Sequence, residues 1–189
     1  MIKTMTTVAA SLLLAGAANA GTVFNVDALA DSWNSGAGAG LDTGIALTAG
    51  QALTVTAGVD DLWSAGALPR WSSANGLTGN LFATGTDESG EAAGTLIGQD
   101  FGIFDGFAYG ELVGQIGGGA YFAVGTSFAG TANATGDLKL FYWDSNFADN
   151  SGSVAADVTL VPEPGSVALM LAGLGIVGGL ARRRAKQVG

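Results

Sequence analysis

One short segment holds most of the side chains in this sequence that could bind a metal ion. Residues 144–150 read DSNFADN, so four side chains with oxygen donors fall within seven positions. Calcium takes six to eight oxygen ligands from carboxylates, amides and backbone carbonyls. The spacing is not that of an EF-hand, and a series of Asx turns explains the same residues equally well. The candidate calcium ligands are Asp144, Asn146, Asp149 and Asn150.

The residues on both sides of this segment alternate as β-strands do. Leu138, Leu140 and Tyr142 fall on one face of the first run, while Phe141 and Trp143 fall on the other. The second run alternates through residues 154–160. We therefore expect strands over Leu138–Trp143 and Ser153–Leu160, with the polar segment as the loop that joins them.

Similar short runs, separated by glycine turns, recur throughout residues 21–161. They lie near residues 45–47, 53–55, 112–116 and 121–124, and none has a helical period. This pattern predicts an all-β domain, an antiparallel β-sandwich over 21–161. Residues 73–106 fit less well and contain the acidic run 86–91, so we expect a long surface loop or a hairpin there.

Two missing residue types exclude several classes of enzyme. The chain has no cysteine and no histidine, which removes thiol chemistry, disulfides, Ser-His-Asp triads and histidine-zinc sites. A glycosidase that uses two carboxylates is compatible with the composition. No acidic residue has a distinctive context for that role, so we do not expect an enzyme.

The charges of the body are strongly unbalanced. Residues 21–161 hold fifteen acidic residues against two basic ones, Arg70 and Lys139, for a formal charge near -13. Such a surface repels phosphate backbones, which argues against nucleic acid as a partner.

The N-terminus has the composition of a secretion signal. Lys3 supplies the positive charge, an apolar stretch follows from Val8 to Ala17, and Ala18-Asn19-Ala20 fits the rule for a cleavage site. Residues 1–20 are therefore predicted to be a signal helix that is removed after Ala20. The alternative is a buried N-terminal helix.

The C-terminus combines three features in a fixed order. Pro162-Glu163-Pro164 precedes the apolar stretch 165–181, which is predicted to be a transmembrane helix, and three arginines follow at 182–184. This order resembles the PEP-CTERM sorting tail over roughly residues 161–184, and we expect the tail as a whole to comprise residues 162–189. The resemblance implies that an exosortase recognises Pro162, Glu163 and Pro164. It also implies a membrane intermediate, and then the cell surface or an extracellular matrix rich in polysaccharide. An ordinary single-span anchor is the alternative, and it leaves the triplet unexplained.

The body resembles the PA-IL-like calcium-dependent galactophilic lectins, which are small β-sandwich proteins. The matching stretches are residues 48–58, 63–71, 110–117 and 144–153. The resemblance implies one calcium ion, with the side chains of Asp144, Asp149 and Asn150 among its ligands. A carbonyl of Asn146 or Phe147, and another near Ala65 or Gly66, would add to them. Sugar hydroxyls would complete the coordination.

Two departures limit this resemblance. The segment 144–150 is about two residues shorter than in the lectins, and their sugar-contacting histidine has no counterpart. Calcium binding therefore carries over better than specificity for galactose. The candidate aromatic platforms for a sugar are Trp63, Trp71 and Trp143, and partial burial in the sandwich is the competing interpretation of each.

These observations support two hypotheses about function. The first is an exported surface or matrix protein with a calcium-assisted carbohydrate-binding domain, whose partners are galactosides or matrix polysaccharide. The second is a structural surface or biofilm-matrix protein without sugar binding.

Overall fold

The computed structural model describes residues 20–34, 40–162 and 170–178. The chain divides into a body, Asn19–Glu163, and a second unit made of Met1–Ala18 and Pro164–Gly189. The predicted signal helix lies outside the described residues, except for Ala20, which is exposed. Of the predicted sorting triplet, only Pro162 is described.

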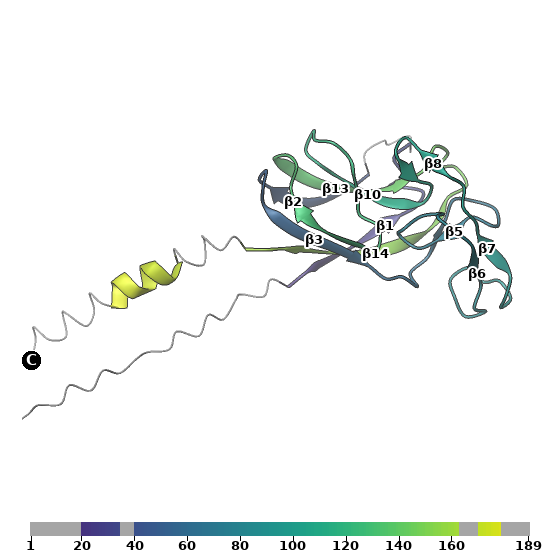
Figure 1. Ribbon diagram of the computed structural model, residues 1–189, viewed down its shortest axis with the longest axis horizontal. Helices are drawn as coiled ribbons and strands as arrows, with labels where there is room; N and C mark the ends of the chain where they lie inside the picture. Colours follow the sequence, from purple (N-terminus) through teal and green to yellow (C-terminus); the bar gives the residue numbers. More distant parts are fainter. Residues whose placement is uncertain (1–19, 35–39, 163–169, 179–189) are drawn as a thin grey trace, which may run out of the picture. The chain divides into compact units, whose positions relative to one another are not determined.

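The first sheet of the body is organised around its longest strand, β14 (Ser151–Leu160). The strand order is β12 (Ser127–Thr131), β3 (Ala52–Ala57), β14, β4 (Trp63–Ser64) and β5 (Trp71–Ser72). Figure 1 labels β3, β14 and β5 of this sheet. Strand β1 (Thr22–Asp27) also pairs with β14. Every pairing in this sheet is antiparallel.

The second sheet contains four strands in the order β11, β10, β13 and β2. Their bounds are Phe122–Ala123 for β11, Glu111–Ile116 for β10, Gly136–Trp143 for β13 and Leu41–Leu47 for β2. These pairings are also antiparallel, and the register between β13 and β2 shifts between Asp137 and Lys139.

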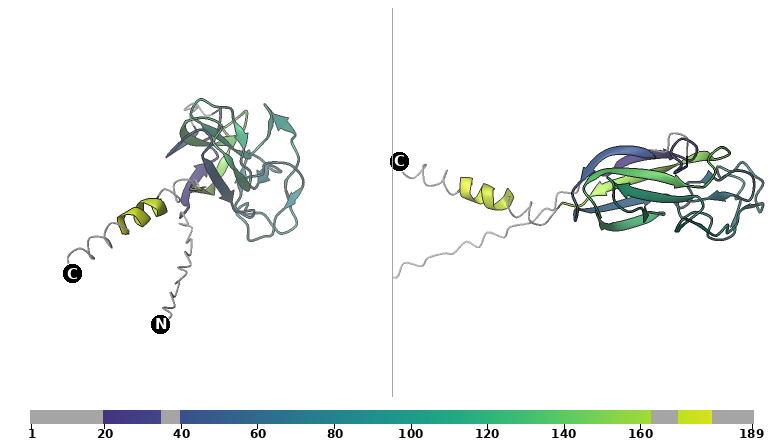
Figure 2. Two further views of the ribbon diagram at one scale, coloured as in Figure 1. Left: turned by 60° about the vertical axis from the view of Figure 1, so that its left-hand side comes forward. Right: turned by 90° about the horizontal axis from the view of Figure 1, so that it is seen from above.

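The two sheets face each other across one hydrophobic core, and Figure 2 shows them as two layers. Leu138, Leu140 and Tyr142 point into this core, together with Val55 of β3 and Val154 of β14. The alternation expected for residues 138–143 is therefore confirmed, as is the β-sandwich. Burial of apolar side chains from both layers is the main contribution to its stability.

The outer face of β13 is also covered, by aromatic side chains. The ring of Trp143 lies 4.9 Å from that of Phe107 and 5.1 Å from that of Tyr121, measured between centroids. The ring of Phe141 lies 5.5 Å from that of Tyr121. This second apolar layer explains why β13 is buried on both faces at its C-terminal end.

The region 73–106 forms short hairpins and turns beside the sandwich. Strand β6 (Leu81–Phe82) pairs with β7 (Leu96–Gly98), and the acidic run lies between them. A second hairpin joins β8 (Ile103–Phe104) to β9 (Phe107–Ala108). Leu62, Ala83 and Ile97 form a small separate core against which Trp71 and Leu81 pack.

In the second unit, residues 170–178 are helical, within the predicted transmembrane stretch 165–181. Among the residues that the structure describes, no helix has the length and apolar character needed to cross a membrane.

Candidate functional site

The loop 144–150 connects β13 to β14, as the sequence predicted, and sheet pairing brings a second segment beside it. Ser64 of β4 pairs with Ser151, and Trp63 pairs with Gly152. The turn between β4 and β5 therefore lies next to the loop. The juxtaposition implied by the lectin resemblance, between residues 65–66 and the loop, is present in the fold.

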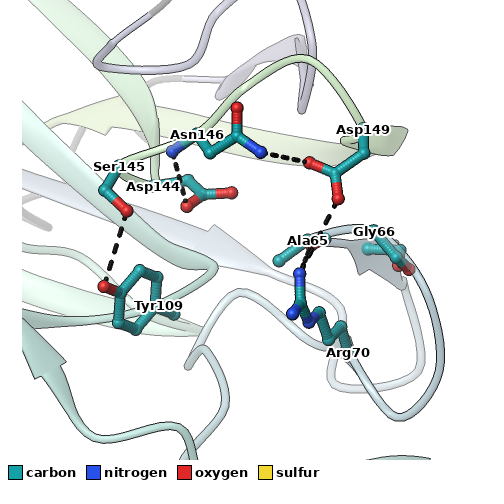
Figure 3. A network of polar contacts seen from close by, with 9 residues as sticks. Ala65, Gly66, Arg70, Tyr109, Asp144, Ser145, Asn146 and Asp149 are labelled. Atoms are coloured by element: carbon teal, nitrogen blue, oxygen red, sulfur yellow. Dashed lines mark hydrogen bonds and ion pairs between the residues drawn. The ribbon is translucent and has the colours of Figure 1, made fainter.

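A hollow of about 260 Å³ opens between these two segments. Three of the four predicted ligands line it, and Arg70 and Ala65 face them from the turn (Figure 3). The remaining walls are provided mainly by apolar and aromatic side chains. The lining residues are Ala65, Arg70, Leu77, Phe101, Tyr109, Asp144, Ser145, Asn146 and Asp149.

Asp144 is the most deeply placed carboxylate of the hollow, with 4% of its surface exposed. Burial raises the pKa of its carboxyl group, and the negative charge of Asp149 adds to this effect. The backbone N–H groups of Asn146 and Ser145 and the side chain of Asn150 act in the opposite direction. The Asn146 N–H donates to Asp144 Oδ1 at 3.1 Å. A carboxylate held away from water in this way is well suited to a cation.

Asn150 lies beside Asp144, and 5% of its surface is exposed. Its Nδ2 donates to the carbonyl oxygen of Ala28 at 3.0 Å. Its Oδ1 is buried and has no hydrogen-bond partner among the described residues. Most buried polar atoms in proteins have a partner, and an exception commonly marks an ordered water or an ion. This orphaned oxygen is the strongest sign of a ligand at the loop.

Asp149 is more exposed and is held by two neighbours. Its Oδ1 accepts a hydrogen bond of 2.9 Å from Asn146 Nδ2. Its Oδ2 lies 3.7 Å from Arg70 Nη1, and the two side chains are 46% and 40% exposed. Arg70 Nη1 also donates to the carbonyl oxygen of Ala65 at 3.3 Å.

The donors at this site are the kind that calcium prefers. They are carboxylate, amide and carbonyl oxygens, without the nitrogen and sulfur ligands typical of zinc. The described residues contain no cluster of three or more acidic, histidine or cysteine side chains that could hold a metal ion. A cation here would therefore depend on amide and carbonyl oxygens as well as on its two carboxylates. The residues that fit this role are Asp144, Asn146, Asp149, Asn150 and the carbonyl of Ala65.

The three tryptophans predicted as sugar platforms do not line the hollow. Trp63 and Trp143 are fully buried, and their Nε1 atoms donate to the carbonyl oxygens of Gly110 at 2.9 Å and Phe104 at 2.7 Å. Trp71 is half-buried and packs against the small core of Leu62, Ala83 and Ile97. The expectation that Trp63 and Trp143 offer open ring faces is wrong, because both sides of β13 are covered and Trp63 belongs to the main core.

Two other aromatic residues, Phe101 and Tyr109, line the hollow instead. The sequence analysis missed both. Tyr109 Oη lies 3.5 Å from Ser145 Oγ, and its ring stacks on Phe104 with centroids 5.7 Å apart. Phe101 is 42% exposed and lies under the Arg70 guanidinium. Phe101 lies in the connection between β7 and β8, and Tyr109 lies in the turn between β9 and β10. No local pattern in such connections indicates which side chains reach the loop.

Comparisons with known proteins found a match to a protein family and similarities to solved structures. Residues 160–185 match the family described as the PEP-CTERM protein-sorting motif. The fold is similar to a solved chain described as the EclA N-terminal domain, a PllA-like lectin. That likeness has 22% identity and a TM-score of 0.48, and covers 73% of this chain and 94% of the other. No curated protein sequence matches the chain.

Proposed function

We propose that the body of this protein is a calcium-assisted carbohydrate-binding domain and that the PEP-CTERM motif directs it to the cell surface or extracellular matrix. The observation that carries the proposal is the buried Oδ1 of Asn150, which has no hydrogen-bond partner in the described part of the chain. It belongs to a loop that lines a hollow with three further oxygen donors. The proposal concerns a binding protein and not an enzyme.

Calcium would supply positive charge to balance the buried carboxylate of Asp144. Asp144 is buried without an ion pair among the described residues, and burial of an unpaired carboxylate is unfavourable. Asp144, Asn146, Asp149 and Asn150 are the proposed side-chain ligands. Cation binding would offset the cost of burying Asp144 and would give the Asn150 oxygen a partner.

A sugar is the ligand that best fits the remaining surface of the hollow. Its lining includes the polar groups of Ser145 and Asn146, which can replace the hydration of sugar hydroxyls. Its wall offers the rings of Tyr109 and Phe101, against which the apolar face of a pyranose can pack.

The C-terminal motif supports export and sorting. We propose that residues 1–20 are removed as a signal peptide and that the apolar stretch 165–181 spans the inner membrane during sorting. An exosortase would then act near Pro162, Glu163 and Pro164. Such sorting would place the domain next to extracellular polysaccharide, which is a source of the proposed ligands.

The test is a glycan array probed with the full-length chain in detergent micelles, once with calcium and once with a chelator. The proposal expects binding to galactosides or matrix polysaccharide that is lost in the chelator. The matched control is Asp144→Asn, which should give no signal in either condition. A blank array for the wild-type chain in both conditions would contradict the proposal and favour a structural matrix protein.

A further inference from the structure

Arg70 contacts two of the oxygens that a cation bound at the proposed site would use. Its Nη1 is 3.3 Å from the carbonyl oxygen of Ala65 and 3.7 Å from Asp149 Oδ2. Both oxygens are among the donors that the proposed calcium site requires. One positively charged group therefore already contacts two oxygens that a metal ion would need (Figure 3).

The guanidinium and a calcium ion exclude each other on chemical grounds. Calcium needs its oxygens at about 2.3–2.6 Å, which leaves no room for an N–H donor between the same two oxygens. Arginine does not lose its charge in proteins, so the two cations also repel each other at this range. Calcium can occupy these oxygens only after Arg70 moves away from them.

The structure also indicates where the displaced side chain would remain. The Arg70 guanidinium carbon lies 5.2 Å from the centroid of the Phe101 ring, which attracts it through a cation–π contact. Phe101 does not contribute a donor to the cation. It can therefore hold the guanidinium within the hollow when Asp149 is released.

The rest of the body provides no substitute for this charge. Between residues 21 and 161, the other basic residue is Lys139 of β13, whose neighbours across the strands are Asp42 and Gln115. Among the described residues, Arg70 is thus the basic side chain that forms an ion pair with Asp149.

We propose that Arg70 competes with calcium for this site. In the metal-free protein its guanidinium contacts the Ala65 carbonyl oxygen and the Asp149 carboxylate, and these contacts raise the calcium concentration at which the site fills. This proposal rests on the proposed function, because it takes the 144–150 loop to be the calcium site. It assigns Arg70 a role in tuning the site that is separate from any contact with the sugar.

The test is calcium titration by calorimetry of the full-length chain in micelles, with Arg70→Gln as the variant. Glutamine keeps part of the stem but removes the charge and the fork of donors. Loss of an exposed ion pair, such as the one between Arg70 and Asp149, changes an equilibrium constant by up to about fivefold. Relief of charge repulsion adds to this, so the dissociation constant for calcium should fall about 3- to 10-fold.

Two further variants keep the result interpretable. Lys139→Gln removes the same charge from the body without touching the loop, and its calcium constant should equal that of the wild-type chain. Arg70→Lys retains the charge with a different donor geometry, and its constant should lie between those of the wild-type chain and Arg70→Gln. Thermal unfolding in chelator checks that each variant is folded.

Each outcome has a distinct meaning. Tighter calcium binding by Arg70→Gln, with Lys139→Gln unchanged, supports the competition. Equal and measurable constants for wild type and Arg70→Gln overturn it and leave the calcium site intact. An equal gain in calcium affinity in Lys139→Gln would mean that the effect comes from net charge alone, which also overturns the competition. If the wild-type chain and all the variants are folded and none binds calcium, both the competition and the calcium site proposed above are wrong.

Discussion

Gly66 leaves the space that the carboxylate of Asp149 occupies. Its backbone has a φ of +109°, and a Cβ at this position would collide with Asp149 Oδ2. The turn after β4 and the loop after β13 thus fit together only because residue 66 has no side chain. This contact sets the position of one of the two carboxylates at the site.

The first prediction concerns Gly66→Ala. The substitution places a Cβ in a backbone region that L-residues rarely adopt and also displaces Asp149, so the free energy of unfolding should fall by about 2–3 kcal/mol. Calcium affinity should fall at least tenfold. Denaturant unfolding and calorimetry measure the two effects.

Gly50→Ala is the matched control for this prediction. Gly50 also has a positive φ, of +89°, but a Cβ there meets no atom of the described residues within 4 Å. Its substitution should cost about 1 kcal/mol of stability and leave calcium affinity unchanged. A similar loss of calcium affinity in both variants would show that the Gly66–Asp149 contact is not responsible.

The second prediction concerns Asp144→Asn. Burial raises the pKa of Asp144, so its charged form is less favourable in the folded protein than in the unfolded chain at neutral pH. In chelator the variant should therefore be at least as stable as the wild type. With calcium at about 100 times its dissociation constant, the wild type should gain about 2.7 kcal/mol, and the variant should gain little. Thermal unfolding with and without calcium measures this, and a variant less stable than wild type in chelator would count against it.

The third prediction compares two aromatic residues. Tyr109→Ala removes a ring from the wall of the hollow, whereas Trp71 lies outside it. At saturating calcium, Tyr109→Ala should weaken glycan binding about 3- to 10-fold, the range expected for loss of one aromatic contact. Trp71→Phe should leave that affinity unchanged. Equal losses in the two variants would place the sugar elsewhere.

The fourth prediction concerns pH and a turn far from this loop in sequence. Asp87 accepts hydrogen bonds from the Ser89 hydroxyl and from the backbone N–H of Thr84, and these bonds lower its pKa to about 2. A lowered pKa in the folded state contributes stability that is present above about pH 4 and is lost as the pH falls towards 2. The Asp87→Asn variant should lack this component, so its melting temperature should fall less than that of the wild type between pH 4 and 2. Parallel curves would contradict the assignment, and an NMR titration of the Asp87 carboxyl checks the pKa directly.

The sequence by itself determined the local features of the site. The alternation of Leu138, Leu140 and Tyr142 predicted the strand before the loop and the face that enters the core, because strand periodicity is a property of neighbouring residues. The oxygen-rich composition of residues 144–150 made the loop a candidate calcium site, although a series of Asx turns explained the same residues equally well. The absence of histidine and cysteine excluded whole classes of enzyme, and the Pro-Glu-Pro triplet indicated the sorting motif that the family match then confirmed.

Only the tertiary structure decided what surrounds those residues. Alternation shows that Trp143 faces away from the main core, and only the fold shows that Phe107 and Tyr121 cover its ring there. Arg70 and Asp149 are far apart in the chain, and they meet because β4 pairs with the first residues of β14. Such pairings depend on the packing of the whole sandwich. The entropy cost of closing a loop grows only slowly with its length, so distant segments can pair almost as readily as near ones. The sequence around each residue therefore carries no local signal of its partner.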